Sequence, residues 1–279
     1  MAQCRPIAVI KGAGDLATGV AYRLFKCGLD VIMTEISRPL AVRRKVAFSE
    51  AVYDGEATVE GVKACLAGTV DQVFKLLEDR SIPVLVDPEA AIIKMICPDV
   101  VVDARMAKRN LGTAKDEAPL VIGLGPGFTA GVDVHAVVET CRGHSLGRVI
   151  YSGSAIPDTG RPGNVGGYTV ERLLRAPAEG IIRTVKSIGD IVEKGETVAF
   201  VNDAPVVAAI PGVLRGLIRD GIEVKKGMKI GDIDPRKDSK CDAISDKALA
   251  IGGGVLEAVF GYFCADGKKW RLQCRQQGK

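Results

Sequence analysis

The sequence is poor in the residue types that nucleic-acid and zinc sites use. Aromatic residues make up 5% of its 279 residues, it has two histidines, and its net charge at pH 7 is +4. Nucleic-acid-binding proteins combine a basic patch with aromatic side chains. The sequence has no such pattern, so we expect no nucleic-acid partner. Two histidines and no clustered thiols likewise argue against a structural zinc site, and we expect no bound metal.

Disulfide and membrane signals are also missing from the sequence. The eight cysteines form no C-x-x-C pair, and the first residues have the pattern of a strand instead of a signal peptide. No uncharged apolar run approaches the roughly 18 residues of a membrane span. We therefore expect a reduced, cytoplasmic protein with no membrane partner. Its length suggests two compact units, and 47% hydrophobic residues are ordinary for a globular protein.

A glycine turn near the N-terminus is the most informative motif. In residues 7–17 a short apolar run breaks on Gly12 and Gly14, and apolar positions then resume at helical spacing. This predicts a strand, a glycine turn and a helix, as in the G-x-G-x-x-G/A dinucleotide fingerprint. A phosphate would lie at the helix N-terminus. Glu35, which ends the next apolar run, stands where an acidic residue binds a ribose hydroxyl.

Asp15 complicates this interpretation. Its carboxylate can cap the helix and accept the N–H groups that a pyrophosphate would use. Arg38, Arg43 and Arg44 follow and can supply compensating cations, since guanidinium groups suit phosphate geometry. The alternative is a strand-to-helix turn without a ligand, and the residues alone leave both interpretations open.

Short β-branched runs then alternate with helical patterns, which predicts a parallel sheet covered on both faces. We expect strands at 45–53, 84–86, 100–102 and 120–124, and a helix from Val70. Ligands of such sheets bind outside the carboxyl ends of the strands. Polar residues and glycines follow these predicted strand ends, and together they predict a binding site at one edge. They are Gly12, Gly14, Glu35, Asp87, Glu89, Asp103, Arg105, Gly123, Gly125 and Gly127.

The second glycine loop, with Gly123, Gly125 and Gly127, leaves two interpretations open. Its glycines resemble an anion-binding nest, but Pro126 lacks an N–H group and weakens such a nest. A plain loop is the alternative. Beyond it, residues 132–151 alternate polar and apolar positions around a turn, which predicts a hairpin.

From Ala176 to Arg236 the chain becomes a series of glycine-punctuated β segments with an internal repeat. Residues 180–195 are echoed by residues 212–227. Two such halves resemble the barrel-sandwich hybrid of biotinyl and lipoyl domains. Those carriers hold a lysine at the hairpin tip between the halves, but residues 202–206 contain none. We therefore expect a scaffold or docking module instead of a swinging-arm carrier.

Residues 242–263 predict a closing helix, interrupted by Gly252, Gly253 and Gly254. An interior glycine costs a helix about 1 kcal/mol relative to alanine, so we expect a break or a close packing contact there. The predicted fold is α/β in three parts: a Rossmann-like parallel-sheet domain at 1–170, a small all-β barrel-sandwich-hybrid domain at 171–236, and a C-terminal helix with a basic tail at 237–279.

Several motifs that span nearly the whole chain resemble one known family in combination. They are residues 12–19, Arg43–Arg44, residues 48–51, 86–89, 102–105, 123–128, Glu139–Thr140, residues 142–144, 146–148 and 230–236. The chain resembles the accessory or maturation proteins of selenium-dependent molybdenum hydroxylases, the YqeB family. The resemblance implies a cytoplasmic partner of xanthine-dehydrogenase-like enzymes, which works with other maturation factors on a labile selenium-containing molybdenum cofactor. It implies no defined reaction.

The first hypothesis is therefore an accessory protein whose Rossmann-like domain binds NAD(P) or molybdopterin cytosine dinucleotide. In it, backbone groups of Gly12, Gly14 and Gly125 bind phosphate, Arg43 and Arg44 clamp it, Glu35 binds ribose, and Asp103 and Arg105 meet the other end of the ligand. The alternative is an NAD(P)-dependent oxidoreductase acting on a small molecule, which the lack of a Tyr-x-x-x-Lys pair weakens. A third hypothesis, a selenium or sulfur carrier, needs a reactive thiol such as Cys141, beside Arg142 and His144; the alternative is an inert cysteine.

Overall fold

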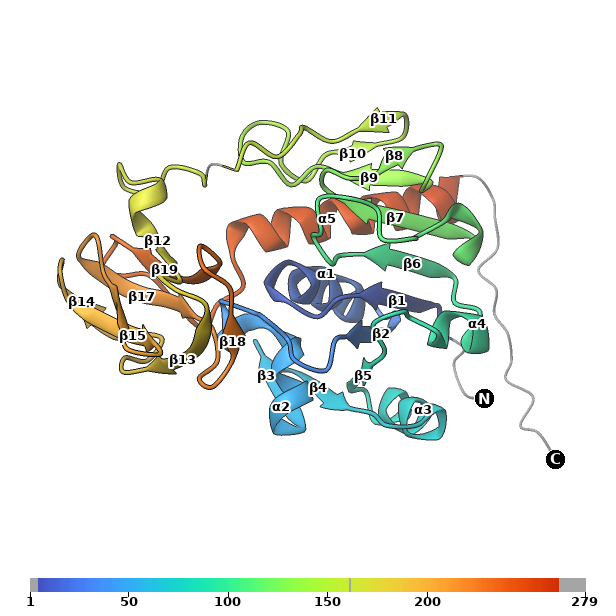
Figure 1. The fold of residues 1–279 in the computed structure, drawn as a ribbon. Coiled ribbons are helices and arrows are strands. Elements are labelled where there is room, and N and C mark those ends of the chain that lie inside the picture. Colours follow the sequence, from blue (N-terminus) through green and yellow to red (C-terminus); the bar gives the residue numbers. More distant parts are fainter. Residues whose placement is uncertain (1–4, 161, 266–279) are drawn as a thin grey trace.

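A nine-stranded sheet forms the centre of the computed structural model, which describes residues 5–160 and 162–265 (Figure 1). The strand order is β10-β9-β7-β6-β1-β2-β5-β4-β3. Neighbouring strands pair in parallel, except for β3 and β10 at the two edges. The strands are β1 (Ile7–Lys11), β2 (Asp30–Glu35), β3 (Glu56–Val59), β4 (Val62–Leu66), β5 (Ile82–Val86), β6 (Val100–Asp103), β7 (Leu120–Leu124), β9 (Ala136–Val138) and β10 (Val149–Ile150).

The order of the parallel strands sets the position of the ligand crevice. If β4, which also pairs in parallel with β5, is left out of the count, β5-β2-β1-β6-β7-β9 is the 3-2-1-4-5-6 order of doubly wound dinucleotide-binding sheets. The direction of winding reverses between β1 and β6, and ligands of such sheets bind at that switch point. The predicted α/β class with a mostly parallel sheet is confirmed, as are the strands predicted at 84–86, 100–102 and 120–124.

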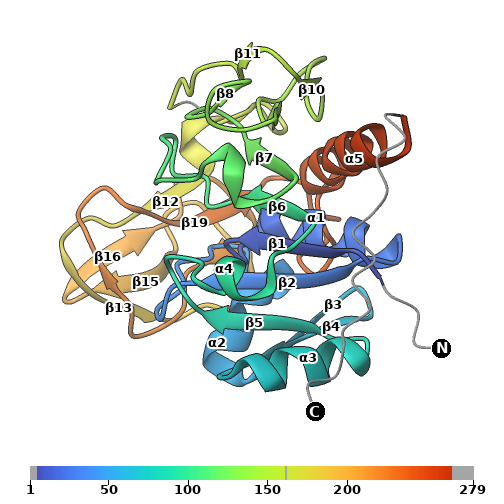
Figure 2. The ribbon, with the colours of Figure 1, turned by 90° about the vertical axis from the view of Figure 1, so that its right-hand side faces the viewer.

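Helices cover both faces of the sheet (Figure 1 and Figure 2). One face packs on α1 (Asp15–Lys26) and α5 (Asp246–Phe260), which share a hydrophobic core with alternate residues of the strands. The other face packs on α3 (Val70–Glu78) and α4 (Ile92–Ile96). The predicted helix from Val70 is thus confirmed. Because both faces are covered, the central strands are continuous apolar runs.

Residues 45–53, predicted as a strand, are helical instead, so that prediction was wrong. They form the short turns η1 (Arg44–Val46) and η2 (Phe48–Glu50), followed by α2 (Ala51–Asp54). Two hydrogen bonds from backbone N–H groups hold this segment over the start of α1: Ser49 N–H donates to the Ala13 carbonyl, and Phe48 N–H donates to Thr18 Oγ1. These contacts come from distant parts of the chain, so local propensity does not reveal them.

The α5 helix is continuous through its three glycines and lies close against α1. A Cβ atom on Gly252 would stand 2.7 Å from the Gly19 carbonyl oxygen, and one on Gly254 would overlap the Gly147 carbonyl. The predicted close packing contact is therefore confirmed, and the helix has no break. By length and composition alone, Asp246–Cys264 is apolar enough to cross a membrane, a test that core helices also pass. Here its Ala248 and Ile251 are buried against the sheet core.

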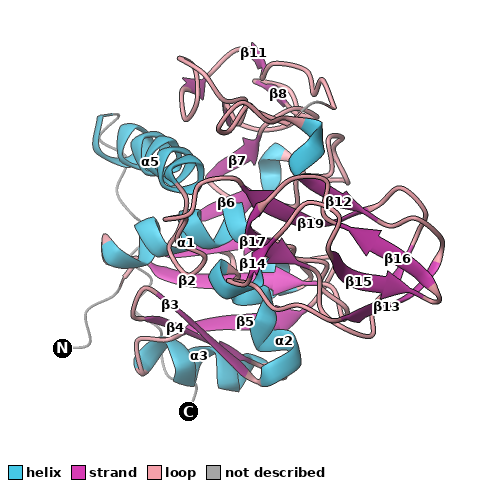
Figure 3. Cartoon of the chain, turned by 90° about the vertical axis from the view of Figure 1, so that its left-hand side faces the viewer, coloured by secondary structure: helices cyan, strands magenta, loops and turns pink. Residues whose placement is uncertain are grey.

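A separate β module follows the sheet in the chain (Figure 3). It consists of two four-stranded antiparallel sheets around its own hydrophobic core. One sheet contains β12 (Leu173–Arg175), β19 (Lys229–Asp234), β17 (Gly212–Leu217) and β14 (Ile191–Val192); the other contains β16 (Ala204–Val207), β15 (Thr197–Val201), β13 (Gly180–Thr184) and β18 (Glu223–Val224).

Short elements complete the chain, and the hairpin predicted within 132–151 is confirmed by the β9–β10 pair. The remaining elements are η3 (Lys115–Glu117), β8 (Thr129–Ala130), β11 (Gly153–Ser154), η4 (Val170–Arg172) and η5 (Gly261–Ala265). The basic tail predicted after them lies outside the described residues. The three-part division of the chain stays a prediction; α5 itself packs into the core of the large sheet.

The β module docks beside the carboxyl edge of the sheet, toward which β1 and β6 point (Figure 1). Leu217 N–H donates to the Val42 carbonyl at 2.9 Å, and Arg44 Nε donates to the Leu217 carbonyl at 2.8 Å. Arg219 adds ion pairs with Glu50 and Asp54 of the η2–α2 segment. Backbone pairing, supported by charge, therefore fixes the module to the segment that follows β2.

We predict that Gly252→Ala lowers the free energy of unfolding by about 1–3 kcal/mol, because its methyl group would push α5 away from α1. Gly253→Ala is the matched control, since Gly253 is exposed and a Cβ there meets nothing within 4 Å. The control should gain up to about 1 kcal/mol from its better helix propensity. Urea unfolding monitored by circular dichroism measures both changes. Equal effects of the two substitutions would contradict the close α1–α5 contact.

Acid should also weaken the β module through Asp234. Burial alone would raise the pKa of Asp234, but hydrogen bonds from the Arg236 side chain and backbone and from Ser239 outweigh it and lower the pKa to about 2. A lowered folded-state pKa contributes stability above the unfolded pKa of about 4 and loses it as the pH falls toward 2. We predict that Asp234→Asn removes about 2 kcal/mol of unfolding free energy at pH 7.

The measurement is urea unfolding of both proteins between pH 7 and pH 2. The wild type should lose stability below pH 4 more steeply than Asp234→Asn does. Asp246→Asn is the comparison, because hydrogen bonding from Arg142 also lowers the pKa of Asp246 to about 2, but its side chain is 72% exposed. Solvent screening makes its expected effect much smaller. Parallel pH profiles for wild type and Asp234→Asn would refute the prediction.

Candidate functional site

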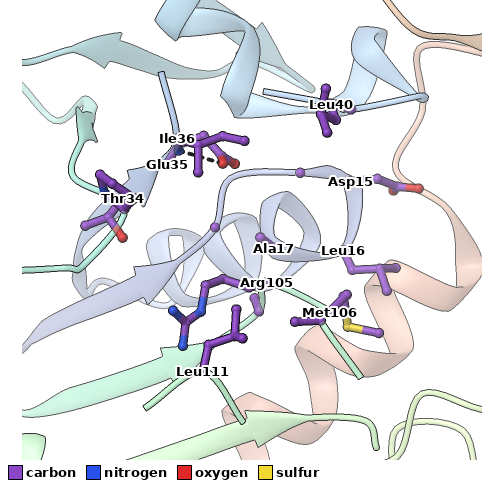
Figure 4. Close-up of a pocket in the computed structure, with 16 residues that line it drawn as sticks. Asp15, Leu16, Ala17, Thr34, Glu35, Ile36, Leu40, Arg105, Met106 and Leu111 are labelled. Atoms are coloured by element: carbon purple, nitrogen blue, oxygen red, sulfur yellow. Dashed lines mark hydrogen bonds between the residues drawn. The ribbon is translucent and has the colours of Figure 1, made fainter. Parts of the chain in front are cut away.

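A cleft of about 470 Å³ lies at the switch point of the sheet, beside the ends of β1, β2 and β6 (Figure 4). The glycine turn after β1 runs between its two walls. One wall follows β2 and the other follows β6. The lining residues are Gly12, Gly14, Asp15, Leu16, Ala17, Thr34, Glu35, Ile36, Leu40, Ala41, Pro88, Ala104, Arg105, Met106, Ala107 and Leu111.

The two glycines of the turn are required for different reasons. Gly12 has φ +96°, a conformation that favours glycine, and its N–H donates to the Thr34 carbonyl at 2.8 Å. Gly14 has φ −71° and ψ −175°, which any residue adopts, and a Cβ atom on it would meet nothing within 4 Å. The folded chain therefore explains Gly12 but not Gly14. Gly14 faces open space at the cleft.

The N-terminus of α1 also faces the cleft without a side-chain cap. The first backbone N–H groups of a helix have no carbonyl partner within it, and Gly14 cannot supply a side-chain acceptor. The carboxylate of Asp15 does not cap the helix; both of its oxygens accept hydrogen bonds from Arg43 at 3.3 Å. Arg43 thereby offsets the one negative charge of the turn, which leaves the helix end suited to an anion.

Glu35 ties the glycine turn to the end of β2. Its Oε2 atom accepts a hydrogen bond from Ala13 N–H at 2.8 Å, and its Oε1 atom accepts one from Ile36 N–H at 2.8 Å. The carboxylate is half-buried in the cleft wall. An ionised carboxylate has about four lone-pair sites, so these two bonds leave it able to accept from a ligand hydroxyl.

Hydrogen bonds to the buried carboxylate of Asp103 hold Arg105 at the opposite wall. Asp103 is 2% exposed and accepts hydrogen bonds from the Arg105 backbone and guanidinium and from Thr113 Oγ1. Lys11 Nζ donates in turn to Thr113 Oγ1 at 2.8 Å and to Glu117 at 2.7 Å. This network fixes the guanidinium at the cleft, where it can contact an anionic or hydroxyl-bearing ligand.

The structure brings Gly12, Gly14, Asp15, Glu35 and Arg105 together in the lining and leaves the other predicted site residues outside it. Asp103 is buried and pairs with Arg105. Arg43 is buried behind Asp15 and also donates to the Ala243 carbonyl. Arg44 is directed to the β module.

The second glycine loop is explained by packing. A Cβ atom on Gly123 would overlap the Phe128 ring, one on Gly125 would overlap Thr140 Oγ1, and one on Gly127 would stand 2.6 Å from Arg109 N. All three glycines lie outside the cleft lining. Their spacing reflects close internal contacts, which a sequence pattern cannot distinguish from contacts with a ligand.

Sequence reasoning missed the apolar part of the cleft. Ile36, Leu40 and Leu111 are 41%, 44% and 43% exposed and line its walls, and Met106 lines it as well. Ile36 directly follows Glu35, so an apolar residue after the strand-end acid was the available signal. Such residues have no periodicity that separates them from ordinary loop positions.

The surroundings of Cys141 give little support to the hypothesis of a reactive thiol. Cys141 is exposed and its Sγ atom contacts the Arg142 carbonyl, while the Arg142 guanidinium donates to Asp246. Within residues 5–160 and 162–265, no three His, Cys, Asp or Glu side chains come together in a group that could hold a metal ion.

Comparison with known proteins identifies a homologue without an established function. The chain is 53% identical over 254 residues to the uncharacterized protein YqeB of Escherichia coli (strain K12), which covers 91% of this chain and 47% of that protein. The chain thus spans about half the length of the curated relative it matches. No family model matches the sequence.

Solved structures show only distant likeness. A succinylglutamate desuccinylase/aspartoacylase from Rhodobacter sphaeroides is 16% identical, with a TM-score of 0.26 over 84% of this chain and 87% of that one. An aspartoacylase family protein from Mesorhizobium loti is 13% identical, with a TM-score of 0.28 over 83% and 86% of the two chains. At these scores the likeness carries no conclusion about fold or chemistry.

We predict that Glu35→Gln destabilises the protein by about 1–3 kcal/mol, because one backbone N–H would face an amide NH₂ group instead of a carboxylate oxygen. Glu89→Gln is the control, since Glu89 is exposed just after β5. Thermal and urea unfolding of the two variants measure the difference. If both variants match the wild type, Glu35 does not hold the turn.

Proposed function

We propose that this protein binds a phosphate-bearing nucleotide ligand in the cleft and serves as an accessory protein in the maturation of selenium-dependent molybdenum hydroxylases. NAD(P) and molybdopterin cytosine dinucleotide are the ligand candidates. The observation that carries the binding proposal is Gly14: its backbone needs no glycine, yet open space at an uncapped helix N-terminus surrounds it. Close approach of a phosphate to the backbone accounts for a glycine at that position.

The walls of the cleft suit the rest of such a ligand. A pyrophosphate at the start of α1 would place a ribose near the end of β2, where Glu35 accepts hydroxyl hydrogen bonds. Ile36 and Leu40 are partly exposed apolar side chains beside it, suited to the face of a base. Arg105 on the opposite wall would contact the far half of the ligand. The 3-2-1-4-5-6 strand order supports a Rossmann-like interpretation of this arrangement.

The accessory role is supported by the motif resemblance and by the homology to YqeB. In this proposal the β module, interpreted as a barrel-sandwich hybrid, docks the hydroxylase or another maturation factor in the cytoplasm. Its β15–β16 turn contains Asn202 and Asp203, and Asn202 is bonded back to Ile181 and Glu179 of the module. A turn held in this way suits a docking surface better than a swinging arm.

Oxidoreductase chemistry is less well supported than binding. The ionisable side chains of the described lining are Asp15, Glu35 and Arg105, and each already bonds to a protein partner. Histidine, lysine, tyrosine and cysteine, the usual proton donors and acceptors besides carboxylates, do not occur among the lining residues. The cleft therefore has groups that bind and orient a ligand and few that transfer protons.

Isothermal titration calorimetry with NAD(H), NADP(H) and molybdopterin cytosine dinucleotide tests the binding proposal. We predict that one of these ligands binds the wild type and that Gly14→Val weakens its binding at least about tenfold, because the side chain fills the space that a phosphate would occupy. Gly14→Val should stay folded and lose at most about 1 kcal/mol of unfolding free energy, since the backbone there is unstrained but valine is a poorer N-cap than glycine.

Gly253→Ala serves as a distant glycine control and should bind like the wild type. The proposed site would be ruled out if none of the three ligands gave a heat of binding, or if the wild type and Gly14→Val bound a ligand equally well. Turnover of a reduced nicotinamide would instead favour the oxidoreductase.

A further inference from the structure

Basic side chains from both modules converge beside the cleft. We call this set the basic junction: Arg43, Arg142, Arg215, Lys229 and Lys247. Arg43 precedes η1, Arg142 follows β9, Arg215 is on β17, Lys229 is on β19 and Lys247 is in the first turn of α5. The junction therefore joins the sheet, the β module and the closing helix.

Asp15 connects the basic junction to the cleft. Asp15 lines the cleft and pairs with Arg43 at 3.3 Å. It also lies within electrostatic range of the other four cations of the junction. In Figure 4 the Asp15 side chain lies at the end of the cleft where the chain of α5 passes. The cations thus border the end of the cleft that contains the α1 N-terminus.

Arg142 pairs with Asp246 at 2.9 Å and Arg43 pairs with Asp15 at 3.3 Å, but carboxylates do not balance the other three cations one for one. Arg215 pairs with Asp234 at 3.4 Å, but Arg236 shares that carboxylate. Lys229 lies 3.8 Å from Asp232, which is shared with Arg172. In the described part of the chain, no carboxylate lies within ion-pair distance of Lys247. One negative charge shared between two cations leaves a positive excess.

Burial makes that excess costly without an anion. Arg43 is 9% exposed, and its Nε atom has no hydrogen-bond partner. The Nε atom of Arg215 is also buried and also has no hydrogen-bond partner. Burial, followed by the neighbouring Arg43, lowers the pKa of Arg215 below its ordinary value. Buried donors without acceptors and like charges close together both disfavour the folded chain. A bound anion offsets the like charges; the two Nε atoms are themselves buried away from solvent.

We infer that the basic junction is an anion-binding subsite that receives a second acidic group, a phosphate or carboxylate, of the molecule bound in the cleft. The inference rests on the proposed function for the remainder of that molecule. Arg215, Lys229 and Lys247 provide the attraction, and Arg43 neutralises Asp15 between the two subsites. Because these cations belong to the β module and to α5, the ligand also holds the module against the sheet.

Inorganic pyrophosphate is the probe for this subsite, because it contains the charge without the nucleoside. We predict that titration calorimetry at low salt detects pyrophosphate binding by the full chain. Arg215→Gln and Lys247→Gln should each weaken it about tenfold, the usual effect of losing one charge-assisted hydrogen bond. Lys194→Gln is the matched control, since Lys194 is an exposed lysine of the same module between β14 and β15. The control should bind like the wild type.

Lys247→Gln keeps the test decisive if the more buried Arg215→Gln fails to fold, because Lys247 is only half-buried. Circular dichroism establishes that each variant is folded before titration. The inference is overturned if the wild type does not bind pyrophosphate, or if Lys247→Gln and Lys194→Gln bind it equally well.

The outcomes also separate this inference from the proposed function. If no dinucleotide binds but pyrophosphate binding depends on Lys247, the proposed ligand is wrong and the subsite stands. Suppose that Gly14→Val weakens dinucleotide binding, but Lys247→Gln binds the dinucleotide as well as the wild type does. The proposed cleft site then stands, and the second subsite is refuted.

Discussion

The backbone contact between α1 and α5 is the constraint on which the arrangement of this molecule depends. Gly19 and Gly252 let the two helices approach until main-chain atoms touch, and the β module lies in the chain between the sheet and α5. The closing helix must therefore run back from the module to the sheet. Its first turn, with Lys247, consequently lies beside the N-terminus of α1. The same contact that completes the core also positions charged groups at the cleft.

Charge at the junction between the modules has a structural and a functional consequence. Asp232 and Asp234 are nearly completely buried and are surrounded by more cations than they can neutralise. Against the effect of burial, hydrogen bonds from Arg236 and Ser239 lower the pKa of Asp234 to about 2, so Asp234 is ionised at neutral pH, and its ion pair with Arg215 links β19 to β17. The remaining cations lie within electrostatic range of Asp15 in the glycine turn. In the proposed function, the charges that stabilise this junction would therefore also attract the ligand.

The sequence predicted the strand, turn and helix at Gly12 well because each signal there is local: an apolar run, a positive-φ position and helical spacing. It failed at 45–53, where the Ser49 and Phe48 N–H groups donate to Ala13 and Thr18 and hold the segment in short helical turns. It also gave Gly125 the same weight as Gly14. A side chain on Gly125 would collide with Thr140, whereas one on Gly14 would meet nothing within 4 Å. This difference depends on the folded structure and is not visible in the sequence.

The negative charge of Asp15 lies beside the proposed phosphate position and bears on which ligand would be preferred there. A carboxylate immediately after the second glycine would repel a phosphate if it stood alone. Arg43 offsets that charge, and the remaining cations of the junction also interact electrostatically with Asp15. If both proposed subsites bind anions, a ligand with one acidic group would gain only the helix end, whereas a ligand with two, spaced to pass Asp15, would gain the helix end and the junction together. The two proposals together therefore predict a preference for a molecule with two separated acidic groups over a simple monoanion.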